Sequence, residues 1–415
     1  MLANLGFGDT FELFAVACAW RNLLRMVGPD LVVFDHSPTA LLASRGLECR
    51  RALIGSGFCC PPDESPMPVF RPEYAGKIDP EKLAKFEQGI LDCVNQLLET
   101  WGEEPMERLS RLYADADENF LTTFPELDHY PQRAEAGAAY WGPVIPGRDG
   151  GGEAPRWPAG GGRRVFAYLK KFANLPDVLD ALADAGHPTI AYVEGASAAL
   201  RRQHETDTLH FADGPLDLAR VGQECDSAVL NAGHGVTAEM LLAGKPILQI
   251  PLALEQRLTA DGVARMGAGL KVPAGQPDHV RPALEAVLNE SRFTDARDSS
   301  PTGTRRSIGG TSVTQCWAGR KRCCAIRRRW CDLAAGLAAR TARPARHPSR
   351  RRSSSSPRRR GWRGTGPAAR TARWHAGAAG GVRRFLMRGG SRGSWSGRTA
   401  RCGGRLAPEA ACDGG

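Results

Sequence analysis

Residues 231–237 form one of two stretches whose residue types and spacing could perform chemistry. They read Asn-Ala-Gly-His-Gly-Val-Thr and open a helix that carries Glu239. Glycines in a strand-to-helix turn let backbone N–H groups and a helix N-terminus face an anion. A second apolar strand, expected at 247–250, is followed by Glu255 and Gln256, which can bind hydroxyl groups. This stretch therefore predicts a phosphate or nucleotide site in an α/β fold.

The second stretch lies near the start of the chain and centres on Asp35. Residues 31–34 are apolar throughout, as buried parallel strands are, and Asp35 and His36 follow them. Another apolar strand is expected at 51–54, so polar residues stand at two strand ends, where α/β folds place active sites. Because neighbouring strand residues point to opposite faces, we expect His36 to be structural or exposed rather than a base.

The elements that must position these residues alternate along the chain. Further strands are expected at 120–124, 164–169, 189–193, 209–211, 227–230 and 267–272, and helices at 9–27, 39–45, 80–101, 106–113, 176–185, 254–266 and 278–290. Asp9 and Glu12 predict the start of the first helix. Its apolar face is predicted from Phe11, Phe14, Cys18, Leu23 and Val27.

The residue pattern after 231 resembles the donor-binding signature of inverting GT-B glycosyltransferases. The resemblance is to the UDP-glycosyltransferase-like superfamily, in its bacterial macrolide-type branch, and it extends without a gap over eight signature positions: Gly233, Gly235, Glu239, Gly244, Pro246, Pro251, Glu255 and Gln256. An ordinary βαβ unit with a structural glycine turn is the alternative, but it does not explain the Glu-Gln pair after the second strand.

Two signature positions depart from the family's residues. The histidine that meets the diphosphate is Asn231 here, which can donate a hydrogen bond but carries no charge, and the family's serine is Val236, with Thr237 beside it. His234 stands where the family varies, and it could contact phosphate or order the helix start.

The resemblance implies an α/β, GT-B architecture of two Rossmann-like domains facing each other across a cleft. It implies transfer of a hexosyl group from a UDP- or dTDP-sugar to a small lipophilic acceptor, with inversion and without a metal or other cofactor. Glu239 would bind the ribose, and Glu255 and Gln256 would bind the donor sugar. Asp35 aligns with the aspartate that orients a catalytic histidine, but that histidine is missing because the chain starts too late. Both domains are therefore expected to be incomplete and the chain impaired.

The same resemblance divides the chain into an acceptor domain at 1–144, a linker at 145–162, a donor domain at 163–297 and a tail at 298–415. Residues 301–415 hold 27 Lys and Arg against 3 Asp and Glu, whereas the remainder holds 28 against 42. The tail's Arg, Gly, Ser and Ala composition predicts disorder, and its abrupt onset suggests a frameshift. The alternative is a genuine basic tail on a non-catalytic nucleotide-sugar-binding protein, with nucleic acid as its partner.

No apolar run reaches about 18 residues, so we expect no membrane span. The start of the chain lacks a basic leader, which favours a cytoplasmic protein over a secreted one. The resemblance implies a monomer.

Overall fold

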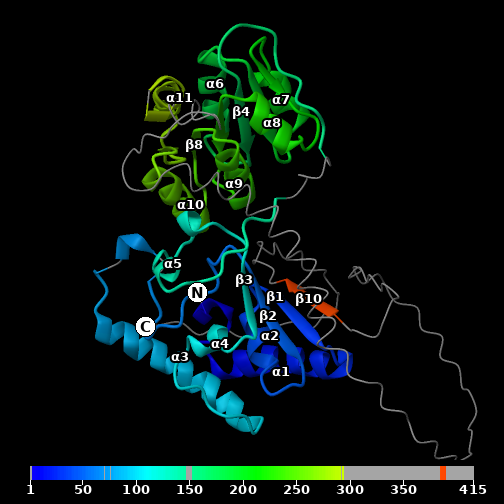
Figure 1. The fold of residues 1–415 in the computed structure, drawn as a ribbon, viewed down its shortest axis with the longest axis vertical. Coiled ribbons are helices and arrows are strands. Elements are labelled where there is room, and N and C mark those ends of the chain that lie inside the picture. Colours follow the sequence, from blue (N-terminus) through cyan, green and yellow to red (C-terminus); the bar gives the residue numbers. More distant parts are fainter. Residues whose placement is uncertain are drawn as a thin grey trace, which may run out of the picture.

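The protein folds into two α/β domains, which are stacked one above the other in Figure 1. The computed structural model describes residues 2–69, 71–74, 76–145, 152–290, 292–293 and the backbone of 384–388. Each domain has its own parallel sheet, so the α/β class and the arrangement of two facing Rossmann-like domains are confirmed.

The first domain is a short parallel sheet covered by helices. Its elements are η1 (Leu2–Leu5), α1 (Thr10–Val27), β1 (Leu31–Asp35), α2 (Pro38–Ala43), β2 (Arg50–Gly55), η2 (Pro72–Tyr74), α3 (Pro80–Thr100), α4 (Arg111–Ala114), β3 (Glu118–Leu121), η3 (Pro125–Leu127) and α5 (Gln132–Glu135). The strands follow the order β10-β1-β2-β3. Because all pairs are parallel, the carboxyl ends of β1, β2 and β3 meet at one edge.

Helix α1 starts as predicted, but its buried face is not the predicted one. The Asp9 carboxylate accepts the backbone N–H of Glu12 at 2.8 Å and caps the helix. Phe11 is 89% exposed, whereas Leu13, Ala17, Arg21 and Leu24 are buried. The predicted face was wrong because the guanidinium of Arg21 lies inside the domain. A prediction based on the spacing of apolar residues leaves a charged residue out of the buried face.

Arg21 is buried with both terminal nitrogens of its guanidinium paired. It donates to the carbonyl oxygens of Ala43 and Arg45, pairs with Glu103 and stacks on the Trp101 ring at 4.3 Å from its centroid. These contacts tie α1 to the end of α2 and to the loop after α3. Charge thus takes part in the core of this domain.

The second domain is a six-stranded parallel sheet between two layers of helices. Its elements are β4 (Val165–Leu169), α6 (Leu175–Asp184), β5 (Thr189–Val193), α7 (Ala198–His204), β6 (Leu209–Phe211), α8 (Leu218–Glu224), β7 (Ser227–Leu230), α9 (His234–Leu242), β8 (Ile247–Gln249), α10 (Leu254–Arg265), β9 (Gly269–Lys271), η4 (Pro277–His279) and α11 (Val280–Asn289). The strand order β6-β5-β4-β7-β8-β9 reverses between β4 and β7. Such a reversal leaves a crevice outside the strand ends, where open α/β sheets bind ligands.

Several predicted elements differ from the observed ones. The helix expected at 106–113 is only α4, because residues 104–110 form an irregular segment whose Met106 is held through both backbone groups by the Asn95 side chain. The strand expected at 120–124 is β3, which begins two residues earlier and ends three residues earlier. Helices α7 and α8 were not predicted; the N-cap bonds of Ser197 and Asp217 are the local signals that mark them.

Almost all of the predicted tail, 298–415, lies outside the described residues. The exception is β10 (Arg384–Arg388), which pairs in parallel with β1, although no strand was expected there. Its sequence, Arg-Phe-Leu-Met-Arg, is a short apolar run that suits the edge of a parallel sheet.

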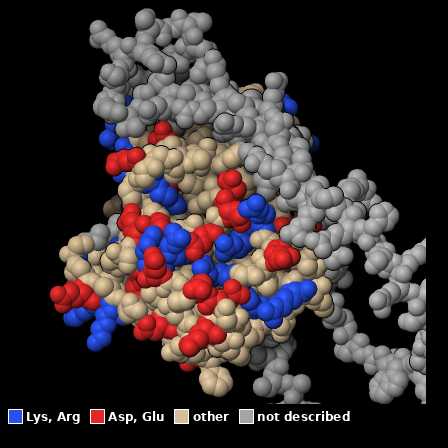
Figure 2. Space-filling model, turned by 60° about the horizontal axis from the view of Figure 1, so that its bottom comes forward, with Lys and Arg blue, Asp and Glu red and all other residues tan. Residues whose placement is uncertain are grey.

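Figure 2 views the molecule from the side of the first domain and shows Lys and Arg interspersed with Asp and Glu on that face. The first domain has ion pairs such as Arg108–Asp63 and Arg111–Asp115. Within the described ranges, no helix is long and apolar enough to cross a membrane.

Candidate active site between the two domains

Three side-chain contacts join the domains at the carboxyl ends of their strands. Ser56, just after β2, donates to Glu255 at the start of α10 (3.1 Å). Thr123, after β3, lies 2.8 Å from the Nε2 atom of His234, the first residue of α9. Arg257 on α10 forms an ion pair with Glu73. The two sheet edges at which the sequence predicted functional residues, one in each domain, therefore face each other.

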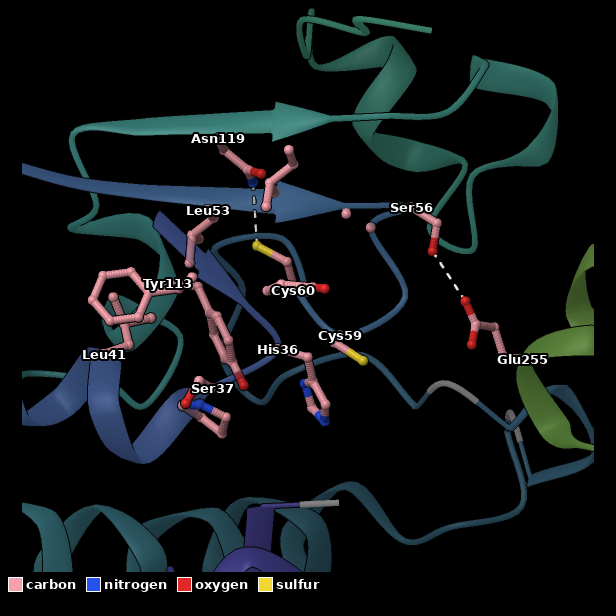
Figure 3. Close-up of a pocket in the computed structure, with 16 residues that line it drawn as sticks. His36, Ser37, Leu41, Leu53, Ser56, Cys59, Cys60, Tyr113, Asn119 and Glu255 are labelled. Atoms are coloured by element: carbon pink, nitrogen blue, oxygen red, sulfur yellow. Dashed lines mark hydrogen bonds between the residues drawn. The ribbon is translucent and has the colours of Figure 1, made fainter. Parts of the chain in front are cut away.

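A pocket of about 230 Å³ opens at this junction, at the carboxyl ends of β1 and β2 (Figure 3). Its apolar walls come from Phe34, Pro38, Leu41, Leu53 and Ile54. Its polar lining includes Asp35, His36 and Ser56 from the first domain and Glu255 from the second. Two predicted site residues from opposite domains, Asp35 and Glu255, therefore line one pocket.

His36 lines this pocket together with Asp35, contrary to the prediction from strand alternation. Strand β1 ends at Asp35, and His36 adopts a left-handed backbone conformation with φ +46°. Alternation holds only within a strand, so the turn brings both side chains to the same cavity. Burial lowers the pKa of His36 below its usual value, against the raising effect of Asp35. The imidazole is therefore neutral near pH 7.

Arg133 fixes the loop that forms one wall of the pocket. Its guanidinium pairs with Asp128 through two hydrogen bonds (3.0 and 2.6 Å) and also donates to the carbonyl oxygens of Gly57 and Cys60. Gly57 has φ +88°, and a Cβ there would meet the guanidinium at 2.4 Å, so a glycine is required. The buried pair thereby holds the loop in the position from which Ser56 reaches Glu255.

Glu255 is a half-buried carboxylate at the boundary of the domains. Burial raises its pKa first, the hydrogen bond from Ser56 lowers it, and the charge of Asp35 raises it again. The charge of Asp35, across the same pocket, thus disfavours ionisation of Glu255. A ligand with several hydroxyl groups would relieve this by donating to Glu255.

The predicted phosphate loop occupies the carboxyl end of β7, and Asn231 holds it in place. The Asn231 amide oxygen accepts the backbone N–H of Lys170 (2.6 Å), and its nitrogen donates to the Ile250 carbonyl (2.7 Å). These bonds tie the loop to the ends of β4 and β8. Asn231 is 3% exposed, so the structure gives it a role in shaping the loop, and its contact with phosphate stays a prediction.

His234 is neutral at the helix start. Burial, followed by the nearby His129, lowers its pKa to about 4. Neither Asn231 nor His234 therefore brings a positive charge to this loop, and an anion would depend on backbone N–H groups and the dipole of α9.

The remaining predicted site residues divide between the loop surface and the interior. Gly233 is exposed, and Gly235 and Val236 are partly buried. Thr237 is fully buried and accepts a hydrogen bond from Gln249, so its hydroxyl faces the sheet. Glu239 is 2% exposed in the interior of α9.

Gln256 caps its own helix: its side-chain oxygen accepts the backbone N–H groups of Leu252 and Ala253. Its proposed contact with the donor sugar, like that of Glu239 with the ribose, stays a prediction.

Sequence reasoning missed the residues that complete the site from inside the first domain. Tyr113, Cys59 and Asn119 line the pocket, and Arg133 and His129 stand behind it. The Gly-Ser-Gly run at 55–57 was the available signal for a loop in need of special support. Nothing in the spacing of Tyr113 or Arg133 pointed to this loop.

Comparisons with known proteins agree with this architecture. No protein-family model matches the chain. The chain is 24% identical over 314 residues to a "PGL/p-HBAD biosynthesis glycosyltransferase" of Mycobacterium tuberculosis, covering 70% of each. Among solved structures it resembles the calicheamicin glycosyltransferase CalG4 (TM-score 0.59, 15% identity, 83% of this chain and 85% of that one). It also resembles the glycosyltransferase VinC, solved in complex with dTDP (TM-score 0.50, 17% identity, 80% and 79% covered).

The fold and the facing strand-end sites define a GT-B protein. By ancestry the chain is a glycosyltransferase, since 70% of its length is related in sequence to a curated glycosyltransferase.

Proposed function

We propose that this protein transfers a hexosyl group from a UDP- or dTDP-sugar to a hydroxyl of a small lipophilic acceptor, with inversion. The observation that carries the proposal is the meeting of the two strand-end sites, where Ser56 of one domain contacts Glu255 of the other. A nucleotide sugar bound along one edge would thereby present its sugar to the pocket on the other. Transfer needs no metal in this scheme, and we place the reaction in the cytoplasm, by a monomer.

The donor side of the proposal rests on the second domain. The loop at 231–237 ends a strand beside the reversal of the sheet and opens α9, which suits a diphosphate. Glu239 would accept hydrogen bonds from the ribose hydroxyls. Glu255 and Gln256 would bind the hydroxyl groups of the donor sugar. The VinC structure holds dTDP, which supports this donor class.

The acceptor side rests on the pocket at the ends of β1 and β2. In the proposed step the acceptor oxygen bonds to the anomeric carbon as the bond from that carbon to the diphosphate oxygen breaks. The electron pair of that bond leaves with the nucleoside diphosphate, and the hydroxyl proton passes to solvent water beside Asp35, because the histidine base that Asp35 is expected to orient has no counterpart among the described residues. The mostly apolar walls suit a lipophilic acceptor.

Calorimetric titration of the full chain with UDP and dTDP tests the donor side. We expect Glu239→Gln to weaken nucleotide binding by about 1.5–3 kcal/mol per lost charged hydrogen bond, and Asn231→Ala by about 1 kcal/mol. Glu205→Gln, at an exposed position of the same domain, is the matched control and should bind like the parent. Equal losses for Glu239→Gln and Asn231→Ala would contradict these role assignments.

The stereochemistry of transfer tests the reaction itself. An α-linked UDP- or dTDP-sugar should give a β-linked product, read from the anomeric coupling by NMR. An α-linked product would exclude direct displacement.

A further inference from the structure

Two buried polar atoms in the pocket lack a hydrogen-bond partner among the described residues. They are the hydroxyl oxygen of Tyr113 on α4 and the Nδ1 atom of His36 after β1. Both residues line the pocket, and Figure 3 shows the Tyr113 hydroxyl pointing to the space beside Ser37 and His36. A buried polar group without a partner costs about 1–3 kcal/mol, so such groups call for an explanation.

The walls around these two atoms are apolar. Phe34, Leu41 and Leu53 are buried core residues that also line the pocket. Asn119, the neighbouring amide, is engaged with the Cys60 sulfur (3.2 Å) and is not directed to Tyr113. These apolar walls and the two unpaired atoms form a chamber within the pocket, whose lining also includes Asp35, Ser56 and Glu255.

The volume limits what the chamber can hold. A cavity of about 150 Å³ holds benzene, so about 230 Å³ admits one six-membered ring with small substituents. A fused polycyclic acceptor would have to leave most of its rings outside.

We propose that this chamber binds a single aromatic ring that carries two hydroxyl groups, which pair with Tyr113 and His36. The inference rests on the proposed function, because it names the class of acceptor, or of acceptor end-group, that the first domain takes. The ring packs between Phe34, Leu41 and Leu53, and its hydroxyl groups satisfy the two atoms that the protein leaves unpaired.

The backbone at His36 supports this role. A residue other than glycine with φ +46° is held in a sparsely populated conformation, and the turn keeps its imidazole at the cavity. The charged groups that influence His36 and its surroundings are Asp35 beside it and Glu255 on α10, which also lines the pocket.

Hydroquinone and p-cresol, which have nearly the same shape, are the probes. A chamber that offered only apolar contact would prefer p-cresol by about fourfold, since a methyl group gains more than a hydroxyl on burial. The proposal expects the reverse order in the full chain, measured by calorimetry, with hydroquinone bound about two- to tenfold more tightly.

Tyr113→Phe is the sharpest variant because it removes only the unpaired hydroxyl and deprives no other protein group of a partner. It should fold with unchanged or raised thermal stability, and its preference should shift to p-cresol. His36→Asn keeps a residue that tolerates the left-handed backbone and should reduce hydroquinone binding by about two- to tenfold. Tyr192→Phe, in the second domain, is the control and should keep the parental order.

Tighter binding of p-cresol by the parent, no binding of either probe, or an unchanged preference in Tyr113→Phe would each overturn the inference. Nucleotide titration reports on the proposed function separately. If the parent chain binds hydroquinone but neither UDP nor dTDP, the donor assignment is refuted and the ring site is retained.

Discussion

The two domains use buried polar groups in different ways. The first domain buries two guanidinium groups, Arg21 and Arg133, each paired with a carboxylate and with backbone carbonyls. In the described part of the second domain, no Arg or Lys side chain is among the buried residues; its loops are held by neutral groups such as Asn231 and Gln249. The first domain therefore depends on specific ion pairs for the shape of its pocket. The second domain depends on regular strands and on hydrogen bonds from side-chain amides for the shape of its loops.

Arg133→Met should have the largest effect, because it leaves the buried Asp128 charge and two carbonyl groups unpaired. We expect a loss of about 3–5 kcal/mol in the free energy of unfolding of the first domain, measured by chemical denaturation. Arg108→Met removes an ion pair with Asp63 that is about one-third exposed and should cost under about 1 kcal/mol. Similar costs for the two variants would show that burial of charge does not distinguish this pocket.

Asn231→Ala tests the corresponding support in the second domain, where a neutral side chain rather than an ion pair holds a loop. It leaves the Lys170 N–H and the Ile250 carbonyl without the side chain that joins them, which should cost about 1–3 kcal/mol. Asn289→Ala, whose side chain contacts Glu285 at an exposed site, is the control and should change stability by less than about 0.5 kcal/mol. A loss that matches or exceeds that of Arg133→Met would reverse the ranking of the two domains.

The pH dependence of stability tests whether His129 and His234, at the boundary between the two domains, are kept neutral by burial. His129 and His234 each have a folded pKa of about 4, lowered by burial from 6.5. The unfolded chain binds their protons below about pH 6.5 and the folded chain does not, so stability is fully present above pH 6.5 and falls toward pH 4. The slope is at most about 1.4 kcal/mol per pH unit for each histidine.

His234→Gln should make this slope shallower in thermal unfolding between pH 6.5 and 4. His279→Gln, at an exposed position, should leave it unchanged. A parental slope in His234→Gln would show that this histidine is not kept neutral by the fold.

The smallest effect is expected from Ser56→Ala, which removes one interdomain hydrogen bond worth about 0.5–1.5 kcal/mol. The pKa of the Glu255 carboxyl should rise, because the Ser56 bond lowers it. Thr123→Ala removes a second interdomain contact, the one to His234, but should leave the Glu255 pKa in place, as NMR titration of Glu255 would show. An unchanged Glu255 pKa in Ser56→Ala would mean that the domains do not meet at this pair in solution.

Much of the second domain could be predicted from its sequence. Strands at 189–193, 209–211 and 227–230 are short apolar runs bounded by polar residues or loops, and the observed β5, β6 and β7 match them. The glycine turn and the helix after it were also placed correctly, as α9. Local sequence suffices for these elements because each is a short apolar run or a glycine turn, whereas α7 and α8 of the same domain were not predicted.

The first domain shows where such reasoning ends. The exposed Phe11 and buried Arg21 invert the simple rule for a helix face, because Trp101, Glu103 and two carbonyl groups surround the guanidinium. Those partners are about 80 residues away along the chain, except for the carbonyls. A periodic pattern on one helix contains no information about them.

The sequence alone determined the α/β class, the strand-end positions of Asp35 and Glu255, and the glycine turn before α9, since these follow from local apolar runs and fixed spacing. Only the tertiary structure decided that Asp35 and Glu255 share one pocket, that His36 turns into it, and that Tyr113 presents an unpaired hydroxyl there. The physical reason is that those positions depend on a left-handed residue after β1, a loop clamped by Arg133, and the docking of two separate sheets. The clamp and the docking are contacts between distant segments, which only the folded chain brings together.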